Sequence, residues 1–265
     1  MPDLPRYFHQ TAHADSYAHL HNQIPMKHVI IVGATSGIGR EIAQIYAQQG
    51  WKVGIAGRRE TLLKELHQQY PSQICYETID VTQDEAVTRL QTLIEKNNGM
   101  NLFLLSSGVG FQNPSLDPSI ELHTAKTNVE GFVRLTTAAF HYFEQQGKGH
   151  MAVISSIAGT KGIGVAAAYS ATKRFQNCYI DALEQLAKLK KLAITFTDIR
   201  PGFVATALLK TRNYPMLMQP SKVAQTIVKA IGKKKRVCII DKRYRLLVAL
   251  WRLIPRGVWK RLPIK

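Results

Sequence analysis

Short runs of β-branched and aliphatic residues alternate with amphipathic stretches of helical length from Met26 onward. This alternation constrains the fold most, because neighbouring parallel strands need a long crossover connection and a helix supplies it. We therefore expect an α/β protein with a doubly wound parallel sheet between two helix layers, in three α/β/α layers. The seven predicted strands are His28–Val32, Lys52–Ala56, Gln73–Ile79, Leu102–Leu105, Met151–Ser155, Ala193–Asp198 and Arg236–Ile240.

The length of 265 residues suits a single sheet-based domain with a tail at each end. A hydrophobic fraction of 45% with 20% charged residues is typical of folded globular chains. We place the domain at residues 26–241, between a poorly ordered N-terminal extension (1–25) and a basic amphipathic C-terminal tail (242–265). The extension lacks the apolar core of a secretory signal.

The three cysteines, Cys75, Cys178 and Cys238, lie far apart and form no metal-ligand spacing. Widely spaced, odd-numbered cysteines are typical of proteins from a reducing compartment, so we predict a cytoplasmic location and no metal site. The histidines near the N-terminus match no recognised metal motif either; they are His9, His13, His19, His21 and His28.

A glycine-rich turn follows the first predicted strand, in the segment HVIIVGATSGIG that spans 28–39, and leads into a predicted helix over 40–49. Glycines there let the backbone approach a pyrophosphate, while the helix N-terminus offers free N–H groups and positive dipole. The spacing G-x-x-x-G-x-G differs from the G-x-G-x-x-G of most dinucleotide-binding domains. It resembles the turn of the short-chain dehydrogenase/reductase family, a Rossmann fold. The resemblance implies that Gly33, Thr35, Ser36, Gly37, Ile38 and Gly39 bind the cofactor.

The end of the second strand indicates which nicotinamide cofactor is used. An NAD-preferring site places an acidic residue there, to bond the ribose 2′-hydroxyl, whereas this chain has Arg58 and Arg59. Arginine clamps a 2′-phosphate through paired charge-assisted hydrogen bonds. We therefore predict NADP(H), with Arg58 as the principal contact and Arg59 as its helper; two solvated arginines at a helix start are the alternative.

The adenine side of the predicted site carries one departure from the family pattern. Asp80 and Val81 resemble the Asp-Val pair whose carboxylate contacts the adenine, although an N-cap role for Asp80 or Thr82 fits the sequence equally well. After the fourth strand the family has Asn-Ala-Gly, whereas this chain has Ser-Ser-Gly at 106–108. Gly108 keeps room for the cofactor, and Ser106 still offers a hydroxyl.

The catalytic prediction rests on spacing. Tyr169 and Lys173 are four residues apart, hence on one helix face, and Ser156 lies thirteen residues before Tyr169 at the end of a strand. This spacing resembles the family's catalytic serine, tyrosine and lysine, and it favours Ser156 over the neighbouring Ser155. Asn128, in TNVEG, matches the family's fourth catalytic position, where a local helix distortion holds a water; an asparagine that faces solvent is the alternative.

The resemblance implies a hydride transfer between a carbonyl or alcohol substrate and the nicotinamide, with Tyr169 as general acid and base. Ser156 would bond the substrate oxygen, Lys173 would hold the ribose, and Asn128 would relay protons through a water. We expect the ammonium of Lys173 to lower the pKa of Tyr169, because one cation at about 4 Å contributes roughly 4 kcal/mol at an effective dielectric of about 20. The remaining predicted cofactor contacts, in RPGFVAT, are Pro201, Gly202, Val204 and Thr206.

Two readings of this assembly remain open at the level of sequence. The first is an active NADP(H)-dependent reductase or dehydrogenase, a homodimer or homotetramer, acting on a hydrophobic substrate. The second is a catalytically silent NADP(H)-binding regulatory or scaffold protein of the same fold. The segment 206–220 would form an apolar lid over the substrate, although core packing explains its side chains as well; they are Leu208, Leu209, Tyr214, Met216, Leu217 and Met218.

The C-terminal end carries most of the positive charge. Of the net +17, residues 233–265 supply +11, from twelve Lys/Arg against Asp241. The run Leu246–Ile254 would be about 14 Å long as a helix, too short to span a bilayer core of about 30 Å. It could lie in a membrane interface through Trp251, Trp259 and the cations, or pack over the substrate pocket or a neighbouring subunit. Charge without base-reading elements does not indicate nucleic-acid binding.

Overall fold

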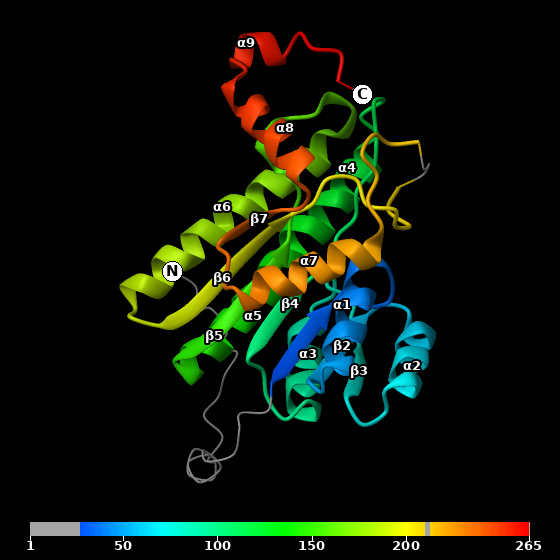
Figure 1. The fold of residues 1–265 in the computed structure, drawn as a ribbon, viewed down its shortest axis with the longest axis vertical. Coiled ribbons are helices and arrows are strands. Elements are labelled where there is room, and N and C mark those ends of the chain that lie inside the picture. The colour runs from blue at the N-terminus through cyan, green and yellow to red at the C-terminus, as the bar shows by residue number, and fades with distance from the viewer. Residues whose placement is uncertain (1–26, 210–212, 265) are drawn as a thin grey trace.

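The computed structural model describes residues 27–209 and 213–264, so the predicted N-terminal extension lies outside the described residues. Within that part, seven parallel strands form one sheet in the order β3-β2-β1-β4-β5-β6-β7 (Figure 1). The order proceeds outward in both directions from β1 and β4, which confirms the doubly wound prediction. The strands are β1 (His28–Val32), β2 (Lys52–Gly57), β3 (Ile74–Thr78), β4 (Leu102–Leu105), β5 (Lys148–Ile154), β6 (Ala193–Arg200) and β7 (Val237–Ile239).

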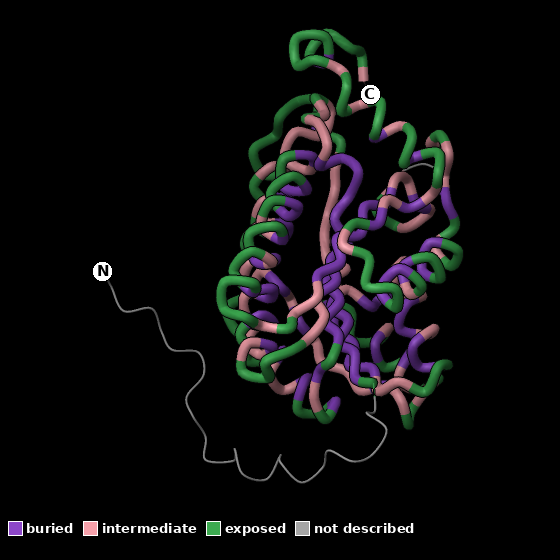
Figure 2. The backbone as a smooth tube through the Cα atoms, turned by 60° about the vertical axis from the view of Figure 1, so that its left-hand side comes forward, coloured by how far each residue is buried: buried purple, intermediate pink, exposed green. Residues whose placement is uncertain are grey.

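Two hydrophobic cores lie on opposite faces of the sheet, because successive strand residues point to opposite sides. Val29 and Ile31 of β1 join the core under α1, α2, α7 and α8, whereas Ile30 and Val32 join the core under α3, α5 and α6. Figure 2 shows the buried strands between helices whose outer surfaces are exposed. The helices are α1 (Gly37–Gln48), α2 (Glu60–Gln69), α3 (Ala86–Lys96), α4 (Pro118–Ala125), α5 (Gly131–Gln146), α6 (Ala167–Leu189), α7 (Pro220–Gly232), α8 (Lys242–Leu253) and α9 (Arg256–Trp259). Short distorted turns are η2 (Lys126–Glu130), η3 (Ile157–Thr160) and η4 (Gly164–Ala166).

Several element boundaries differ from the predicted ones. Strand β5 begins at Lys148, three residues early, because its backbone pairs with β6 from the Lys148–Ala193 register onward, whatever the side chains. Helix α1 begins at Gly37 rather than at residue 40, directly after the N-cap Ser36. Strand β7 keeps only three residues because it pairs with β6 over that length alone.

The strand order reverses between β1 and β4, which places the loops after these two strands side by side. In open parallel sheets, ligands bind in the crevice beyond the carboxyl ends of the strands at such a reversal. The glycine turn after β1 and the Ser-Ser-Gly segment after β4 meet there, so the fold brings the predicted cofactor-binding segments together.

The C-terminal segment packs back onto the domain (Figure 1). Tyr244 and Val248 of α8 and Trp259 of α9 are buried, and the Trp259 indole donates to the carbonyl of Gly162 at 2.7 Å. The opposite face of α8 exposes Leu246, Leu250 and Leu253. No helix in the described ranges is long and apolar enough to cross a membrane.

Candidate active site

The glycine turn adopts backbone conformations that side chains rarely allow. Gly33 has φ +95° and Gly37 has φ +57°, and a Cβ on Gly33 would lie 2.5 Å from the backbone nitrogen of Ser107. A Cβ on Gly39 would lie 2.2 Å from the Gly33 carbonyl oxygen. The first N–H groups of α1 have no acceptor within the helix, and the side chain of Ser36 does not cap them. The turn therefore presents backbone donors suited to a pyrophosphate.

The two arginines after β2 have different positions. Arg59 lies against the glycine turn, where it donates to Thr35 Oγ1 at 2.7 Å and to Ser36 Oγ at 2.6 Å. Arg58 is exposed, and its charge acts on Asp80 at the end of β3. Arg59 is thus the arginine that the protein itself fixes beside the turn, which the sequence did not indicate.

Asp80 forms a local turn. Its Oδ1 accepts from Thr82 N at 3.0 Å and from Thr82 Oγ1 at 2.8 Å. Burial opposes ionisation, but these hydrogen bonds and the Arg58 charge outweigh it, so the pKa of Asp80 is lowered. The N-cap of α3 is Glu85, so the N-cap role considered for Asp80 or Thr82 is wrong. Val81 is buried, and its carbonyl accepts from Arg134 at 2.9 Å.

The segment after β4 lies under the glycine turn. A Cβ on Gly39 would stand 3.2 Å from Ser106 Oγ, and the Ser106 backbone nitrogen donates to the Val32 carbonyl at 2.8 Å. A Cβ on Gly108 would lie 3.3 Å from Asn128 Oδ1 and 3.4 Å from Lys173 Nζ. The segment 106–108 therefore lies between the glycine turn, which Ser106 meets, and the predicted catalytic residues, which Gly108 meets.

Ser156, Tyr169 and Lys173 are brought together by β5 and α6. Ser156 follows β5 and is the N-cap of η3, accepting from Ala158 N at 3.1 Å, and its hydroxyl acts on the phenol of Tyr169. Lys173 is buried, with Nζ 5.8 Å from the centre of the Tyr169 ring. Its ammonium donates to the Ile154 carbonyl at 3.2 Å and to Gln176 Oε1 at 3.0 Å.

Burial controls the ionisation of this pair. It raises the pKa of Tyr169, with the Ser156 hydrogen bond opposing the rise, and it lowers the pKa of Lys173 to about 8, with the Asp198 charge opposing the fall. The expectation that Lys173 lowers the pKa of Tyr169 is therefore wrong for the protein alone. The Lys173 ammonium lies 5.8 Å from the ring centre and donates to the Ile154 carbonyl and Gln176, so desolvation of the phenol dominates. Tyr169 is protonated at neutral pH.

Asn128 lies fully buried within η2, a π-helical turn, so the solvent-facing alternative is wrong. Its Oδ1 accepts from Val109 N at 2.9 Å, and its Nδ2 donates to the Val109 carbonyl at 2.7 Å and to Thr172 Oγ1 at 3.2 Å. Its own carbonyl accepts from Gln176 Nε2 at 2.9 Å. Gln176 thus links Asn128 to Lys173. We did not predict this residue, although its position three residues after Lys173 on one helix face is a usable signal.

Ser155, which the sequence analysis rejected as catalytic, belongs to a different network. Its hydroxyl donates to the Asp198 carboxylate and accepts from Asn177 Nδ2 at 2.9 Å. Asp198 also accepts from Asn177 at 2.9 Å and pairs with Arg200 Nη2 at 2.6 Å. This buried network joins β5, α6 and β6 behind the catalytic residues and leaves Ser156 alone to face Tyr169.

The loop after β6 returns to the glycine turn. The Pro201 carbonyl accepts from Ile157 N at 3.1 Å, and a Cβ on Gly37 would lie 3.0 Å from Thr206 Cγ2. Val204 pairs with Met218 in a short parallel bridge. Residues 210–212 of the predicted lid lie outside the described part. Among the described lid residues, Met218 is buried in the core and Leu208 is exposed. Tyr214 stacks on Phe203, with 4.5 Å between the ring centres.

Tyr244 of α8, which we did not single out from the sequence, fixes this loop. Its hydroxyl accepts from Phe203 N at 3.1 Å and donates to the Pro215 carbonyl at 3.0 Å. A Cβ on Gly202 would lie 2.3 Å from its ring. The tail therefore packs against the loop at the edge of the site, in agreement with the packing alternative, while one of its faces remains exposed.

Comparison with known proteins agrees with this geometry. Residues 27–216 match the family model described as short chain dehydrogenase. Dehydrogenase/reductase SDR family member 7B of Xenopus tropicalis is 28% identical over 240 residues, which cover 80% of this chain and 76% of the relative. An uncharacterized oxidoreductase of Myxococcus xanthus is 31% identical over 210 residues, covering 76% of this chain and 82% of the relative.

Solved structures share the fold. A serine dehydrogenase in its closed form, complexed with NADP+, superposes with a TM-score of 0.72 at 24% identity, covering 80% of this chain and 93% of that one. An actinorhodin polyketide ketoreductase variant with NADPH gives a TM-score of 0.71 at 23% identity, covering 81% and 95%. The family match spans the glycine turn, the predicted catalytic residues and the start of the loop after β6, and the protein therefore belongs to the short-chain dehydrogenase/reductase family of oxidoreductases.

Proposed function

We propose that this protein interconverts a carbonyl and an alcohol with NADP(H) as the hydride carrier, and that Tyr169 acts as general acid in reduction and general base in oxidation. The observation that carries the proposal is the continuous set of contacts from Ser156 through Tyr169 and Lys173 to Gln176 and Asn128. A protein that only binds a nucleotide has no need for this buried set of proton-carrying groups.

The residues present fit a dinucleotide. Bound NADP(H) would supply or accept the hydride. The backbone donors at the start of α1 suit its pyrophosphate, and Arg58 with Arg59 suits a 2′-phosphate, with no carboxylate at the end of β2 to repel it. The other proposed contacts are Gly33, Thr35, Ser36, Gly37, Ile38, Gly39, Asp80, Val81, Ser106, Gly108, Asn128, Tyr169, Lys173, Pro201, Gly202, Val204 and Thr206.

The proton chemistry follows from the protonation states. Because burial keeps the pKa of Tyr169 raised, its hydroxyl is available as a donor to a substrate oxygen, which is the role needed for reduction. Ser156, already bonded to Tyr169, would orient that oxygen. The ammonium of Lys173 is held by Gln176 and the Ile154 carbonyl, and it would supply positive charge near Tyr169 once the phenol has given up its proton.

The test compares two tyrosines of α6. Tyr169→Phe removes the proposed acid, and we expect a loss of about 10²- to 10⁴-fold in carbonyl-dependent NADPH oxidation. Tyr179→Phe is the control, because Tyr179 lies on the same helix and its hydroxyl is hydrogen-bonded to Thr137, at 3.2 Å, away from the site. A panel of hydrophobic ketones would supply the substrates. Unchanged turnover in Tyr169→Phe, across every substrate that the wild type accepts, would contradict the mechanism.

Cofactor preference has its own measurement. We expect NADPH to bind more tightly than NADH, and the difference to shrink in Arg58→Ala and Arg59→Ala. Tighter NADH binding that neither substitution affects would exclude the NADP assignment. NADPH binding without turnover of any substrate would favour the regulatory or scaffold alternative.

The exposed face of α8 supports peripheral membrane contact. Leu246, Leu250 and Leu253 form one apolar face beside tail cations, the pattern of an interfacial helix. We expect Leu250→Gln/Leu253→Gln to reduce co-sedimentation with anionic vesicles, while Leu189→Gln, equally exposed but on α6, leaves it unchanged. Equal sedimentation of both variants would exclude this surface. The cytoplasmic location and the homo-oligomeric state stay predictions.

A further inference from the structure

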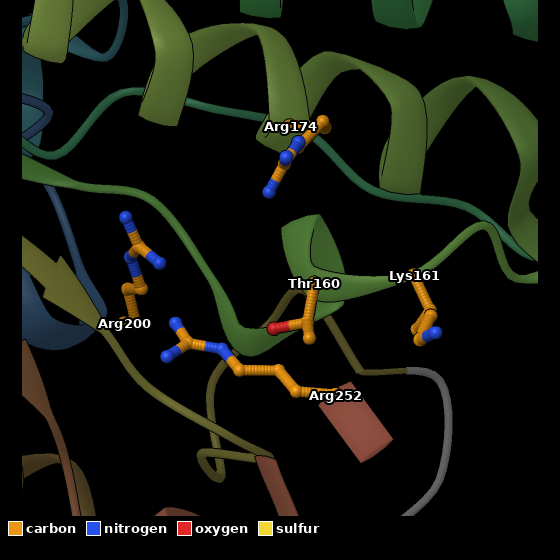
Figure 3. Close-up of a pocket in the computed structure, with 5 residues that line it drawn as sticks. All are labelled: Thr160, Lys161, Arg174, Arg200 and Arg252. Carbon is orange, nitrogen blue, oxygen red and sulfur yellow. The ribbon is translucent and has the colours of Figure 1, made fainter. Parts of the chain in front are cut away.

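A cavity of about 300 Å³ lies behind the catalytic residues, where four segments distant in sequence meet. Thr160 ends η3, which starts directly after Ser156; Arg174 follows Lys173 on α6; Arg200 ends β6; and Arg252 comes from α8. Lys161 completes the lining. Figure 3 shows the guanidinium groups of the three arginines directed toward the space between α6 and α8, with Lys161 at its edge.

The lining carries an excess of positive charge. Four of its five residues are cationic and none is acidic. Arg200 is neutralised by Asp198 at 2.6 Å. Arg174, Arg252 and Lys161 form no ion pair with any carboxylate in residues 27–209 and 213–264. Gathering like charges in a partly enclosed space is unfavourable, and an anion in the cavity would relieve that repulsion.

The cavity also holds an unused polar group. The hydroxyl oxygen of Thr160 is buried and has no hydrogen-bond partner among the described residues, and in Figure 3 it points into the space between the arginines. Lys161, in contrast, donates to the Ile254 carbonyl at 2.8 Å and lies 5.7 Å from the Trp259 ring centre. A hydroxyl donor flanked by guanidinium groups suits an oxyanion.

We propose that this cavity binds the phosphate group of a phosphate ester. Planar guanidinium groups pair with phosphate through two parallel hydrogen bonds, and a dianion balances the three uncompensated cations better than a single carboxylate does. Arg252 lies on α8 and Thr160 on η3, so the ligand would fasten the C-terminal helix to the turn that positions Ser156. The inference does not depend on the proposed function, because neither Tyr169 nor the cofactor site takes part.

Thermal unfolding with inorganic phosphate tests the site. At a phosphate concentration about tenfold above the Kd, we expect the Tm of the wild type to rise by roughly 3 to 6 °C. The rise should be lost in Arg174→Gln/Arg252→Gln and kept in Arg245→Gln, the same change at an exposed position of α8 outside the cavity. Phosphate bound between Arg58 and Arg59 would be unaffected by the double substitution, so the difference between the two proteins reports this cavity alone.

The proposal would be overturned by an equal rise in the wild type and in the double variant, or by an equal rise with chloride at matched ionic strength. The source of the phosphate is separated by two further probes. A soluble ester, glycerol phosphate, that reproduces the rise supports a free metabolite. Vesicles containing phosphatidic acid that sediment the wild type but not the double variant support a lipid headgroup. Absence of both effects would overturn the proposal as well.

Discussion

The Asp198–Arg200 pair allows a quantitative test of what stabilises the region behind the catalytic residues. Asp198 is fully buried in β6, and its Oδ2 accepts from Arg200 Nε at 2.8 Å and from Asn177 at 2.9 Å. Asp198→Asn keeps the shape of the side chain and removes its charge. The guanidinium of Arg200, only 7% exposed, would then have no counter-charge.

The expected cost follows from this burial. Removing one member of a buried ion pair leaves an uncompensated charge and typically costs about 3 to 5 kcal/mol. The amide of the asparagine keeps part of the bonding to Ser155 and Asn177, so we expect a value near the lower end, about 3 kcal/mol. Because native domains are stable by only about 5 to 15 kcal/mol, the variant would lose a large part of its free energy of unfolding. The Asp198 charge also raises the pKa of Lys173. Without that charge, the pKa of Lys173 would fall further below its ordinary value.

Urea unfolding of the wild type and Asp198→Asn measures this cost, with Asp84→Asn as the matched control. Asp84 also pairs with an arginine, Arg134 at 3.1 Å, but its side chain is fully exposed. Exposed pairs contribute little, so the control should lose far less than Asp198→Asn. If the two substitutions reduce the free energy of unfolding equally, burial of the Asp198–Arg200 pair does not contribute as argued.

Three further predictions concern single residues. Burial lowers the pKa of Lys173 to about 8, so between about pH 8 and pH 10 the unfolded chain binds more protons than the folded protein does. The contribution of Lys173 to the free energy of unfolding therefore rises with pH, by about 3 kcal/mol in total. Urea titrations should show this rise in the wild type and not in Lys173→Met, and parallel pH profiles of the two proteins would contradict it. Burial lowers the pKa of His150 from 6.5 to about 4, so the free energy of unfolding should fall as the pH is lowered from 6.5 to about 4. The fall should be less steep in His150→Gln. An identical acid profile in both proteins would refute the lowered pKa of His150. A Cβ on Gly110 would lie 2.8 Å from the Tyr169 ring, so Gly110→Ala should displace the ring and lower kcat by about tenfold or more. Gly164→Ala should leave kcat unchanged, because a Cβ at position 164 meets open space. Equal kcat values in the two variants would show that the ring tolerates the contact.

The sheet, and the way in which Ser156, Tyr169 and Lys173 come together, could be predicted because both depend on local patterns. Alternating strands and helices dictate a parallel sheet, and the sheet reversal places the segment after β1 beside the segment after β4. The Tyr169–Lys173 spacing predicts a shared helix face. The direction of the Tyr169 pKa shift could not be predicted from the spacing of Tyr169 and Lys173. The spacing gives an approximate distance between the two groups, but it does not give the desolvation that dominates the pKa of Tyr169 or the other acceptors that hold Lys173.

Contacts between distant segments were equally inaccessible. Arg59 rather than Arg58 bonds Thr35 and Ser36 of the glycine turn, and the periodicity of the sequence carries no information on contacts between the two segments. The side chains that line the cationic cavity come from positions as far apart as 160 and 252, so together they form no motif along the sequence. Tyr244 has no distinguishing feature among the tail residues of the sequence, and only the structure shows that its hydroxyl bonds the loop after β6.

The contact between Tyr244 and Gly202 also has an evolutionary consequence. The phenol ring occupies the space that any side chain at position 202 would need, so the two positions should change together among homologues. A relative with a larger residue at 202 should carry a small residue at 244 or direct its C-terminal segment elsewhere. Exchanging tails between family members would succeed only when this pair is exchanged as a unit.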